Sequence, residues 1–358
     1  MFTVSQPSTG KFKGVRVLAG DIGGTKTSLG VVEIGAARLS LIRHARYASR
    51  DHPSLESVLR EFLRGRGDEF AAAAFGVAGP VREGRAFVTK LPWRIEEKRL
   101  ARLLKLPGRV RLVNDFVAAA LGLPYLPPAS LAVLARGRPE PGGPIGLIGA
   151  GTGLGQAALL PFGEGYEPAA SEGGHADFGP RSRREDALLR FVRGRCGRVS
   201  RDRLLSGEGL RLIYEFLRSE GRRREDAAVR RALRREDPAA VISRFGLARK
   251  DPLCADALAM FVSIYGSEAG NLALQYKATG GVFVAGGIAP KILKALRRGR
   301  FLRALRSKPP LAATLRKIPV RVVLEPELGL YGAAAAAYRT AIEVRRPSSK
   351  RRTRRTAL

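Results

Sequence analysis

The chain contains the sequence Arg109-Val110-Arg111-Leu112-Val113-Asn114-Asp115-Phe116-Val117-Ala118-Ala119-Ala120, in which an apolar strand gives way to an alanine-rich helix. The change falls at Asn114 and Asp115. The pattern therefore predicts a carboxylate at the carboxyl end of a strand, which is where open α/β sheets place their chemistry. Asn and Asp are also favoured as helix caps. Taken alone, these residues fit either an active-site acid or a structural cap, and the neighbouring motifs decide between the two.

A glycine-rich turn precedes this segment, at Asp21-Ile22-Gly23-Gly24-Thr25. Because glycine has no Cβ, the backbone N–H groups of Gly23 and Gly24 can approach phosphate oxygens closely. Thr25 adds a hydroxyl, and Asp21 can anchor a hydrated Mg²⁺ ion. The same string also suits an ordinary hairpin turn, so it indicates a phosphate site only in combination with other motifs.

A second glycine-rich segment follows, at Gly149-Ala150-Gly151-Thr152-Gly153-Leu154-Gly155. Its spacing superficially resembles a dinucleotide-binding fingerprint. Residues 156–160 favour a strand that stops at Pro161, however, which leaves no crossover helix. We therefore interpret the segment as a second phosphate hairpin. Neither segment contains a P-loop. The pairing of the two hairpins predicts two related halves of the chain, and the acid between them predicts phosphoryl transfer.

The length and composition of the chain predict two α/β domains. It has 358 residues, of which 45% are hydrophobic, and this is too long for one small core. Three prolines mark the junction between the domains, at positions 124, 127 and 128. The predicted parts are an N-terminal arm (1–14), a small α/β domain (15–124) completed by a C-terminal helix (325–346), a large α/β domain (125–324) and a basic disordered tail (347–358). Within the large domain we predict a loop over 163–182 and assign no element to 236–250.

Cysteine usage and charge narrow the class of protein. Cys196 and Cys254 are the only cysteines, so neither a disulfide framework nor a zinc site of four thiols can form, and a cytoplasmic location is expected. No segment has the roughly 20 apolar residues of a membrane span, so no membrane association is expected. The formal charge is +32. Such a charge fits either an arginine-rich solvated surface or a weak polyanion contact through the basic tail.

Further motifs follow the two hairpins and the acid in a recognisable order. They are Glu172-Gly173-Gly174-His175-Ala176-Asp177-Phe178, Leu205-Ser206-Gly207-Glu208-Gly209-Leu210, Gly266-Ser267-Glu268-Ala269-Gly270-Asn271-Leu272-Ala273-Leu274 and Val284-Ala285-Gly286-Gly287-Ile288. With the first motifs they span residues 17 to 335 and resemble the bacterial ATP-dependent glucokinase family, in the hexokinase–actin–Hsp70 group. The resemblance implies a two-lobed actin-like ATPase (ribonuclease H-like) α/β fold. A central cleft would hold glucose and MgATP, and closure of the lobes would exclude water.

The resemblance also implies roles for individual residues. Asp115 matches the catalytic base, which accepts the proton of the sugar's 6-hydroxyl as that oxygen attacks the γ-phosphoryl group. Asn114, Glu172 and His175 match sugar-binding positions, and amide, carboxylate and imidazole groups can all hydrogen-bond to sugar hydroxyls. The sugar is therefore expected to be bound by side chains from several separate motifs.

The residues expected to bind ATP and Mg²⁺ come from the glycine-rich turns. Gly286 and Gly287 match the turn against which the adenosine lies. The remaining members of the set are Asp21, Gly23, Gly24, Thr25, Gly151, Thr152 and Gly153, with Asp21 holding Mg²⁺ through water.

The chain departs from the family pattern at two sugar-binding positions. The family usually has a glutamate before Leu-Ser-Gly, whereas this chain has Asp202, which is one methylene shorter. The shorter side chain is expected to leave a sugar hydroxyl imperfectly paired, unless the loop moves inward or Lys90 compensates. Ahead of Trp93 the family commonly has Thr-Asn, whereas this chain has Thr89-Lys90, which resembles the Thr-Lys sugar contact of eukaryotic hexokinases. We keep Asp202, Thr89 and Lys90 as sugar-binding candidates.

The predicted function is that of a glucokinase, which converts D-glucose and MgATP to glucose 6-phosphate and ADP, and the family implies a homodimer. One alternative is a kinase of another hexose or with a polyphosphate donor. Another is a non-catalytic sugar-binding or nucleic-acid-binding protein on the same scaffold. The cysteine cluster of the zinc-containing kinase and repressor family is missing, and no helix-turn-helix segment precedes residue 15, so structural zinc and a repressor role are not expected.

Overall fold

The computed structural model describes residues 14–35 and 38–345. The predicted tail, and all of the predicted arm except Gly14, lie outside these ranges. The described residues divide into two compact units: unit 1 contains those up to Pro127 and from Glu325 on, and unit 2 is Pro128–Leu324. Within the described ranges, no helix is both long and apolar enough to cross a membrane.

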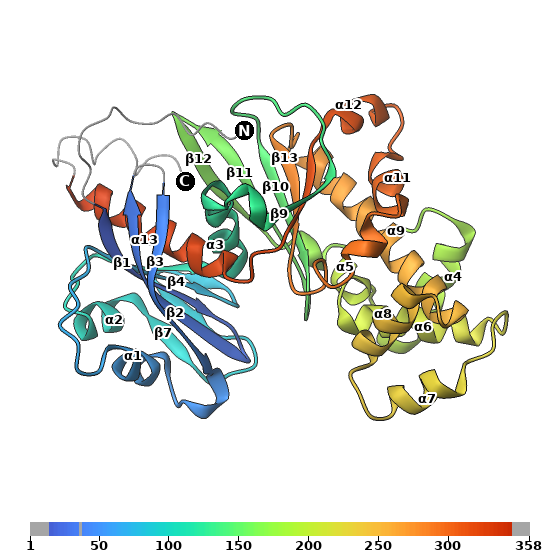
Figure 1. Cartoon of the computed structure of the whole chain (residues 1–358), viewed down its shortest axis with the longest axis horizontal. Helices are drawn as coiled ribbons and strands as arrows, with labels where there is room; N and C mark the ends of the chain where they lie inside the picture. The colour runs from blue at the N-terminus through green and yellow to red at the C-terminus, as the bar shows by residue number, and fades with distance from the viewer. Residues whose placement is uncertain (1–13, 36–37, 346–358) are drawn as a thin grey trace. The chain divides into compact units, whose positions relative to one another are not determined.

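Unit 1 is built on a five-stranded sheet in the order β3-β2-β1-β4-β8, with a small three-stranded sheet, β5-β6-β7, beside it (Figure 1). Strand β1 pairs antiparallel with β2 and parallel with β4, and β4 pairs parallel with β8. The strands of unit 1 are β1 (Val15–Ile22), β2 (Lys26–Gly35), β3 (Arg38–Ala48), β4 (Ala73–Val77), β5 (Val81–Arg82), β6 (Arg85–Phe87), β7 (Arg94–Glu96) and β8 (Val110–Asn114). Its helices are α1 (Leu55–Leu63), α2 (Glu97–Leu103), α3 (Asp115–Gly122) and α13 (Leu328–Arg345).

Helix α1 illustrates how the core of unit 1 forms. Ser54 caps the helix by accepting a hydrogen bond from the backbone N–H of Ser57. The apolar residues of α1 recur at helical spacing, so that Val58, Leu59 and Phe62 all pack into the core under the sheet. This core fixes the strands whose ends carry the candidate site.

Helices α3 and α13 pack unusually closely because glycines remove side chains from their interface. A Cβ on Gly332 of α13 would lie 1.5 Å from the backbone oxygen of Ala118, and one on Gly122 of α3 would lie 2.6 Å from that of Leu328. Both distances are shorter than any real Cβ contact, so only glycine fits. Helix α13 is thereby held against the helix that begins at Asp115.

Unit 2 is built on a six-stranded sheet in the order β12-β11-β10-β13-β14-β9. Strand β10 pairs antiparallel with β11 and parallel with β13, which repeats the arrangement of β1, β2 and β4. The strands are β9 (Leu131–Ala135), β10 (Ile145–Ala150), β11 (Leu154–Phe162), β12 (Gly165–Ser171), β13 (Gly281–Ala285) and β14 (Val320–Val323). The helices are α4 (Arg183–Cys196), α5 (Arg201–Leu204), α6 (Gly207–Ser219), α7 (Ala227–Leu233), α8 (Pro238–Ala248), α9 (Pro252–Gln275), α10 (Leu293–Leu296), α11 (Arg300–Arg306) and α12 (Ala312–Lys317). The shared topology agrees with the two related halves that the paired hairpins predict.

Two sequence-based expectations for unit 2 are wrong. The predicted loop over 163–182 contains β12, which pairs with β11 along its whole length; alanine, proline and glutamate give this strand little β propensity, so pairing rather than composition defines it. The unassigned stretch 236–250 contains α8. Its start has a clear signal, because Asp237 caps the helix and Pro238 occupies its first turn.

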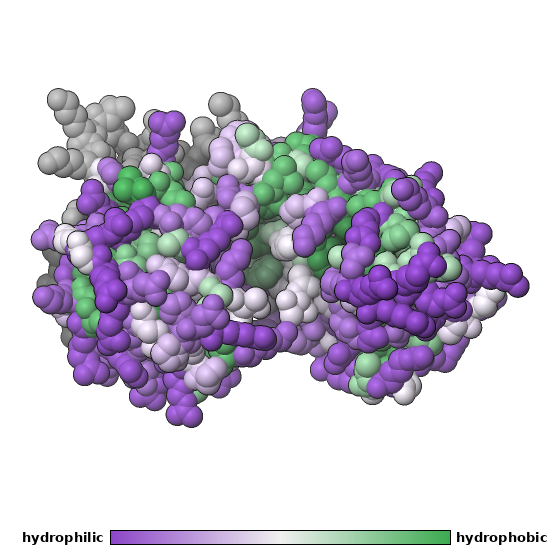
Figure 2. Space-filling model, turned by 60° about the horizontal axis from the view of Figure 1, so that its bottom comes forward, coloured by the Kyte–Doolittle hydropathy of each residue, from purple (hydrophilic) through white to green (hydrophobic). Residues whose placement is uncertain are grey.

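The arginine-rich surface is extensively paired with acids. Arg211 bonds to Glu208 and Glu215, and Arg244 bonds to both carboxylate oxygens of Glu236. Figure 2 shows hydrophilic side chains over much of the exposed face of each unit. A solvated surface therefore accounts for part of the basic residues, although they outnumber the acids by 64 to 32.

Candidate functional site

The acids of unit 1 lie at one edge of its main sheet. Ile22 of β1, Val77 of β4 and Asn114 of β8 are in register, and because these strands are parallel their carboxyl ends meet at the same edge. Asp21 lies one residue before Ile22, and Asp115 follows Asn114. The packing therefore brings Asp21, Asn114 and Asp115 to one edge.

The carboxyl group of Asp21 is held in an environment that favours its neutral form. Burial, followed by repulsion from Asp115 and Glu327, raises its pKa to about 7, while Lys26 acts in the opposite direction. Helix α13 also packs on this group, since a Cβ on Gly329 would lie 2.7 Å from Oδ2 of Asp21. A second carboxylate nearby and a raised pKa are the conditions under which a bound cation would be stabilising.

Asn114 acts as the helix cap that its residue type suggests. Its Oδ1 accepts hydrogen bonds from the backbone N–H groups of Phe116 and Val117, and its Nδ2 donates to the carbonyl of Gly79 at 3.4 Å. The N–H of Phe116 also donates to Oδ1 of Asp115 at 2.9 Å. The structural interpretation of Asn114 is therefore correct, and these bonds orient both side chains at the start of α3.

The first glycine-rich turn joins β1 to β2 and is supported from behind by Ser49. The Ser49 hydroxyl donates to the carbonyl of Gly23 at 2.8 Å, and its backbone N–H donates to the carbonyl of Thr25 at 3.0 Å. Gly24 has no room for a side chain, because a Cβ would lie 2.4 Å from the backbone oxygen of Thr89. This close approach brings Thr89 and Lys90 next to the turn, with Lys90 in a left-handed backbone conformation (φ 70°).

The predicted nucleotide-binding glycines of unit 2 lie together at the ends of β10 and β13. Gly286 has φ +81°, and a Cβ there would lie 2.5 Å from the backbone oxygen of Ala150. The N–H of Ile288 donates to that same oxygen at 3.2 Å. The turn at Gly286 and Gly287 is therefore held directly against the Gly151–Gly153 hairpin, in which Thr152 is exposed.

Tyr265 of α9 supports this hairpin, and the sequence analysis did not identify it. Its side chain is fully buried, and its hydroxyl accepts a hydrogen bond from the backbone N–H of Ala150 at 3.1 Å. The hydroxyl also lies within hydrogen-bonding distance of the carbonyls of Ile148 and Ala285. Burial raises the pKa of Tyr265, so the phenol stays protonated. The only signal in the sequence is a hydroxyl-bearing aromatic residue within an apolar helix.

Asp202 contacts the same hairpin. Its Oδ1 accepts a hydrogen bond from the backbone N–H of Leu154 at 2.6 Å. A Cβ on Gly153 would lie only 2.5 Å from that oxygen, so glycine is needed there for the contact to form. Ser200 caps the short helix α5 that carries Asp202.

Glu172 and His175 are exposed on a loop beside β11. His175 Nε2 lies 3.9 Å from Glu172 Oε2, and both side chains are more than two-thirds exposed. Between them, a Cβ on Gly174 would lie 2.0 Å from the backbone oxygen of Leu154. The loop is therefore fixed against the start of β11, while its two polar side chains face solvent.

A buried polar network holds this loop from below. Arg201 donates from its backbone N–H to the carbonyl of Ala176, and from Nη1 to Oε1 of Glu268 at 2.8 Å. Glu268 is 4% exposed and also accepts from Gln156 and Asn271. Glu268 belongs to a motif identified in the sequence, but its supporting role depends on long-range contacts that the motif alone does not reveal.

Unit 1 thus brings together Asp21, Gly23, Gly24, Thr25, Thr89, Lys90, Asn114 and Asp115. Unit 2 brings together Gly151, Thr152, Gly153, Glu172, His175, Asp202, Gly286 and Gly287. In chemical terms, unit 1 contributes paired carboxylates beside a backbone turn. Unit 2 contributes a glycine-lined hairpin beside a polar loop.

Comparison with known proteins identifies close relatives of this chain. The family model described as Glucokinase matches residues 18–340. The chain is 39% identical over 338 residues to a glucokinase of Nostoc punctiforme, covering 90% of this chain and 99% of that protein. It is also similar to the crystal structure of a glucokinase from an Antarctic psychrotroph, with a TM-score of 0.79, 27% identity and coverage of 92% of this chain and 100% of that one.

A more distant structure has the same fold. It is a ROK-family glucokinase from Streptomyces griseus in complex with glucose and AMPPNP, with a TM-score of 0.60 and 23% identity, covering 90% of this chain and 99% of that one. The two-lobed actin-like fold class expected from the sequence is confirmed by these neighbours.

Proposed function

This chain belongs to the glucokinase family, and on that premise we propose that it transfers the γ-phosphoryl group of ATP to the 6-hydroxyl of D-glucose, giving glucose 6-phosphate and ADP. It is an ATP-dependent hexose kinase. The observation that carries the proposal is the edge of the unit 1 sheet. Parallel strands end there in register, and the carboxyl groups of Asp21 and Asp115 are close enough to repel one another. The glucose and AMPPNP bound by the S. griseus protein support the choice of substrates.

Asp115 is the proposed catalytic base. It is half-buried at the start of α3, and the bond from the Phe116 N–H fixes the orientation of its carboxylate. That carboxylate would accept the proton of the 6-hydroxyl as the oxygen attacks. A carboxylate of ordinary basicity suffices, because a loose phosphoryl-transfer transition state requires mainly alignment and charge neutralisation.

Asp21 is the proposed anchor for Mg²⁺, held through water. Its partial burial and the nearby Asp115 and Glu327 disfavour its ionised form, and a divalent cation would relieve that repulsion. When bound, the ion would neutralise charge on the β- and γ-phosphates. The residues present therefore fit a hydrated magnesium ion.

The glycine-rich turns are the proposed ATP-binding elements. Gly23, Gly24 and Thr25 in unit 1, and Gly151, Thr152 and Gly153 in unit 2, would direct backbone N–H groups and hydroxyls toward phosphate oxygens. Gly286 and Gly287 would accept the adenosine, because a turn without side chains leaves its backbone accessible. We propose that the hydroxyls of glucose are bound by Thr89, Lys90, Asn114, Glu172, His175 and Asp202.

The experiment is a coupled assay of the purified chain with a panel of hexoses and two phosphoryl donors, ATP and polyphosphate. We expect the highest kcat/KM with glucose and ATP, and loss of turnover when EDTA removes Mg²⁺. Preference for polyphosphate would favour the alternative donor, for which the net charge of +32 is the supporting observation. Absence of turnover with every pair would instead favour a non-catalytic binding protein.

A homodimer, a cytoplasmic location and a weak polyanion contact through the basic tail complete the proposal. Sedimentation of the purified chain measures the first, and fractionation of cells the second. Retention on a polyanion column at low salt, with and without residues 347–358, measures the third.

A further inference from the structure

Unit 2 contains a pocket of about 410 Å³ that none of the predicted site residues lines. Helix α9 forms its floor with apolar residues that include Leu258 and Val262. Three arginines surround it: Arg249 from the end of α8, Arg298 from the end of α10 and Arg300 from the start of α11. The volume is in the range of small-molecule sites in proteins.

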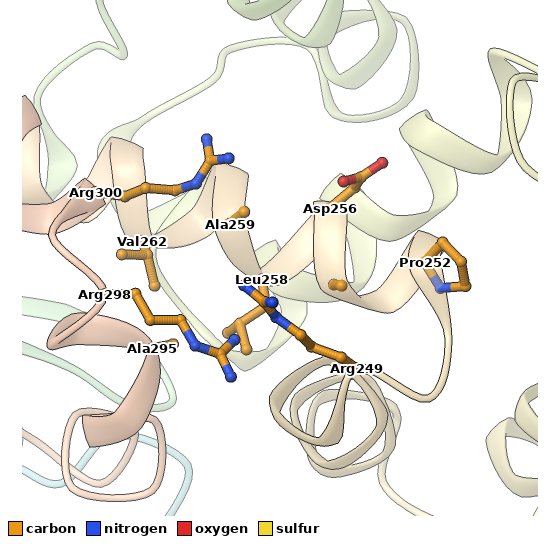
Figure 3. A pocket seen from close by; sticks show the side chains of 10 residues that line it. Arg249, Pro252, Asp256, Leu258, Ala259, Val262, Ala295, Arg298 and Arg300 are labelled. Carbon is orange, nitrogen blue, oxygen red and sulfur yellow. The ribbon is translucent and has the colours of Figure 1, made fainter.

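Two of the arginines approach the same part of the floor. Figure 3 shows Arg249 and Arg298 reaching from opposite sides toward one another beside Leu258, while Arg300 and Asp256 lie along the other edge of α9. Arg298 is held in this position because its Nη2 donates to the carbonyl of Leu247 at 3.1 Å, near the end of α8. Two positively charged side chains therefore line one pocket whose floor includes apolar residues.

Arg249 occupies its position at a conformational cost. It ends α8 in the left-handed backbone region, with φ 54° and ψ 25°, where glycine or asparagine is the usual residue. The chain thus keeps an arginine at a point where the backbone favours a residue without a large side chain. This is consistent with a role for the guanidinium in the pocket.

The positive charge of the pocket is not balanced from within it. Among the described residues that line the pocket, Asp256 is the only acid. Its Oδ2 lies 3.5 Å from Nε of Arg223, which is outside the pocket. Asp251 is nearby in the sequence, but it caps α9 by accepting from the N–H of Cys254, and so offsets the positive end of that helix.

We propose that this pocket binds a phosphate dianion carried by a small metabolite. The guanidinium groups of Arg249 and Arg298 would bind the phosphate oxygens, because the planar fork of arginine matches phosphate geometry. The carbon skeleton of the metabolite would lie over Leu258 and Val262. The site does not depend on the kinase activity, so it can be tested even where that activity fails.

The test is calorimetric titration of the full chain with glycerol 3-phosphate and, separately, with inorganic phosphate, at constant ionic strength. The Arg249→Gln/Arg298→Gln double variant is expected to lose at least about tenfold in affinity. The matched control is Arg297→Gln/Arg303→Gln, which removes the same charge from exposed positions outside the pocket and should keep affinity within about twofold. Asp256→Asn should tighten binding.

The two probes distinguish the source of the phosphate. Tighter binding of glycerol 3-phosphate supports a phosphate ester, whereas equal binding would show that the carbon skeleton adds nothing and would overturn the metabolite in favour of free phosphate. Equal losses in the two double variants would mean that the anion responds only to overall charge, which would overturn the proposal. Lack of saturation at millimolar probe in the wild-type chain would overturn it as well. If the Arg249→Gln/Arg298→Gln variant folds poorly, the Asp256→Asn variant tests the proposal instead. Weaker or unchanged binding of the phosphate probe by Asp256→Asn would contradict the proposal.

Discussion

The carboxylate of Asp202 accepts a hydrogen bond from the backbone N–H of Leu154 at 2.6 Å. Asp202 is a proposed sugar-binding residue, and one of its carboxylate oxygens is thus already hydrogen-bonded to the proposed phosphate hairpin. The helix that carries Asp202 also carries Arg201, which bonds to the backbone beside His175. Helix α5 therefore links the proposed sugar-binding loop and the proposed phosphate hairpin within unit 2.

This contact determines what we expect of Asp202→Glu. Because Oδ1 of Asp202 already lies 2.6 Å from the backbone nitrogen of Leu154, we expect the extra methylene of glutamate to disturb this hydrogen bond and displace the hairpin rather than improve sugar binding. We predict that KM for ATP rises several-fold and kcat/KM falls by about tenfold, equivalent to a charge-assisted hydrogen bond. Steady-state kinetics with each substrate varied will measure this.

The control for this prediction is Asp177→Asn, since Asp177 is an exposed acid on the neighbouring loop that pairs with Arg198. It should leave both KM values nearly unchanged. A rise in KM for glucose alone in Asp202→Glu would mean that Asp202 serves only the sugar.

Asp115→Asn should lower kcat by at least about 100-fold, because the variant cannot accept the proton of the 6-hydroxyl. KM for glucose should change little, since the amide keeps the shape of the carboxylate. The melting temperature should stay close to that of the parent, which separates lost chemistry from lost folding. A near-normal kcat would exclude Asp115 as the base.

Tyr265→Phe tests the support of the hairpin from α9. The change leaves the buried N–H of Ala150 without its partner, which should cost about 1–3 kcal/mol of unfolding free energy and raise KM for ATP. Urea denaturation and kinetics measure the two effects. Tyr276→Phe, at the end of the same helix, is the matched control. Equal behaviour of the two variants would argue against a role for the Tyr265 hydroxyl.

Asp21→Asn should alter the pH dependence of stability. The pKa of Asp21 is about 7 in the folded protein and 3.8 ordinarily, so the folded protein retains a proton that the unfolded chain has lost. The stabilising contribution of this group to the free energy of unfolding is complete below about pH 4 and is lost as the pH rises through 7. In EDTA at pH 8 the variant should be more stable than the parent by up to about 4 kcal/mol, although inactive.

Urea unfolding of both proteins at pH 5, 6, 7 and 8 measures this difference. The difference in unfolding free energy between variant and parent should grow with pH for Asp21→Asn. It should not change with pH for the control Asp51→Asn, which removes an exposed acid. A constant difference across the series would mean that Asp21 is ionised in the folded protein throughout.

Much of unit 1 was predictable because its information is local. The strand that stops at Asn114 and the turn at Gly23 and Gly24 carry their own signals, and parallel pairing then brings them to one edge. The supports of unit 2 were not predictable in this way. Tyr265 reaches Ala150 across 115 residues and Glu268 reaches Gln156 across 112, so neither contact leaves a pattern in the sequence nearby. Strand β12 was missed for a similar reason, since its pairing with β11, rather than its own composition, makes it a strand.

The close packing of α13 on α3 affects the order in which the two units can fold during synthesis. Unit 2 is complete at Leu324, before the ribosome has synthesised α13. Unit 1 begins the chain, yet it lacks the surface that covers Ala118 until Gly332 has emerged. Nascent unit 2 can therefore fold first, and the helix that carries the proposed base can pack fully only after α13 has been synthesised.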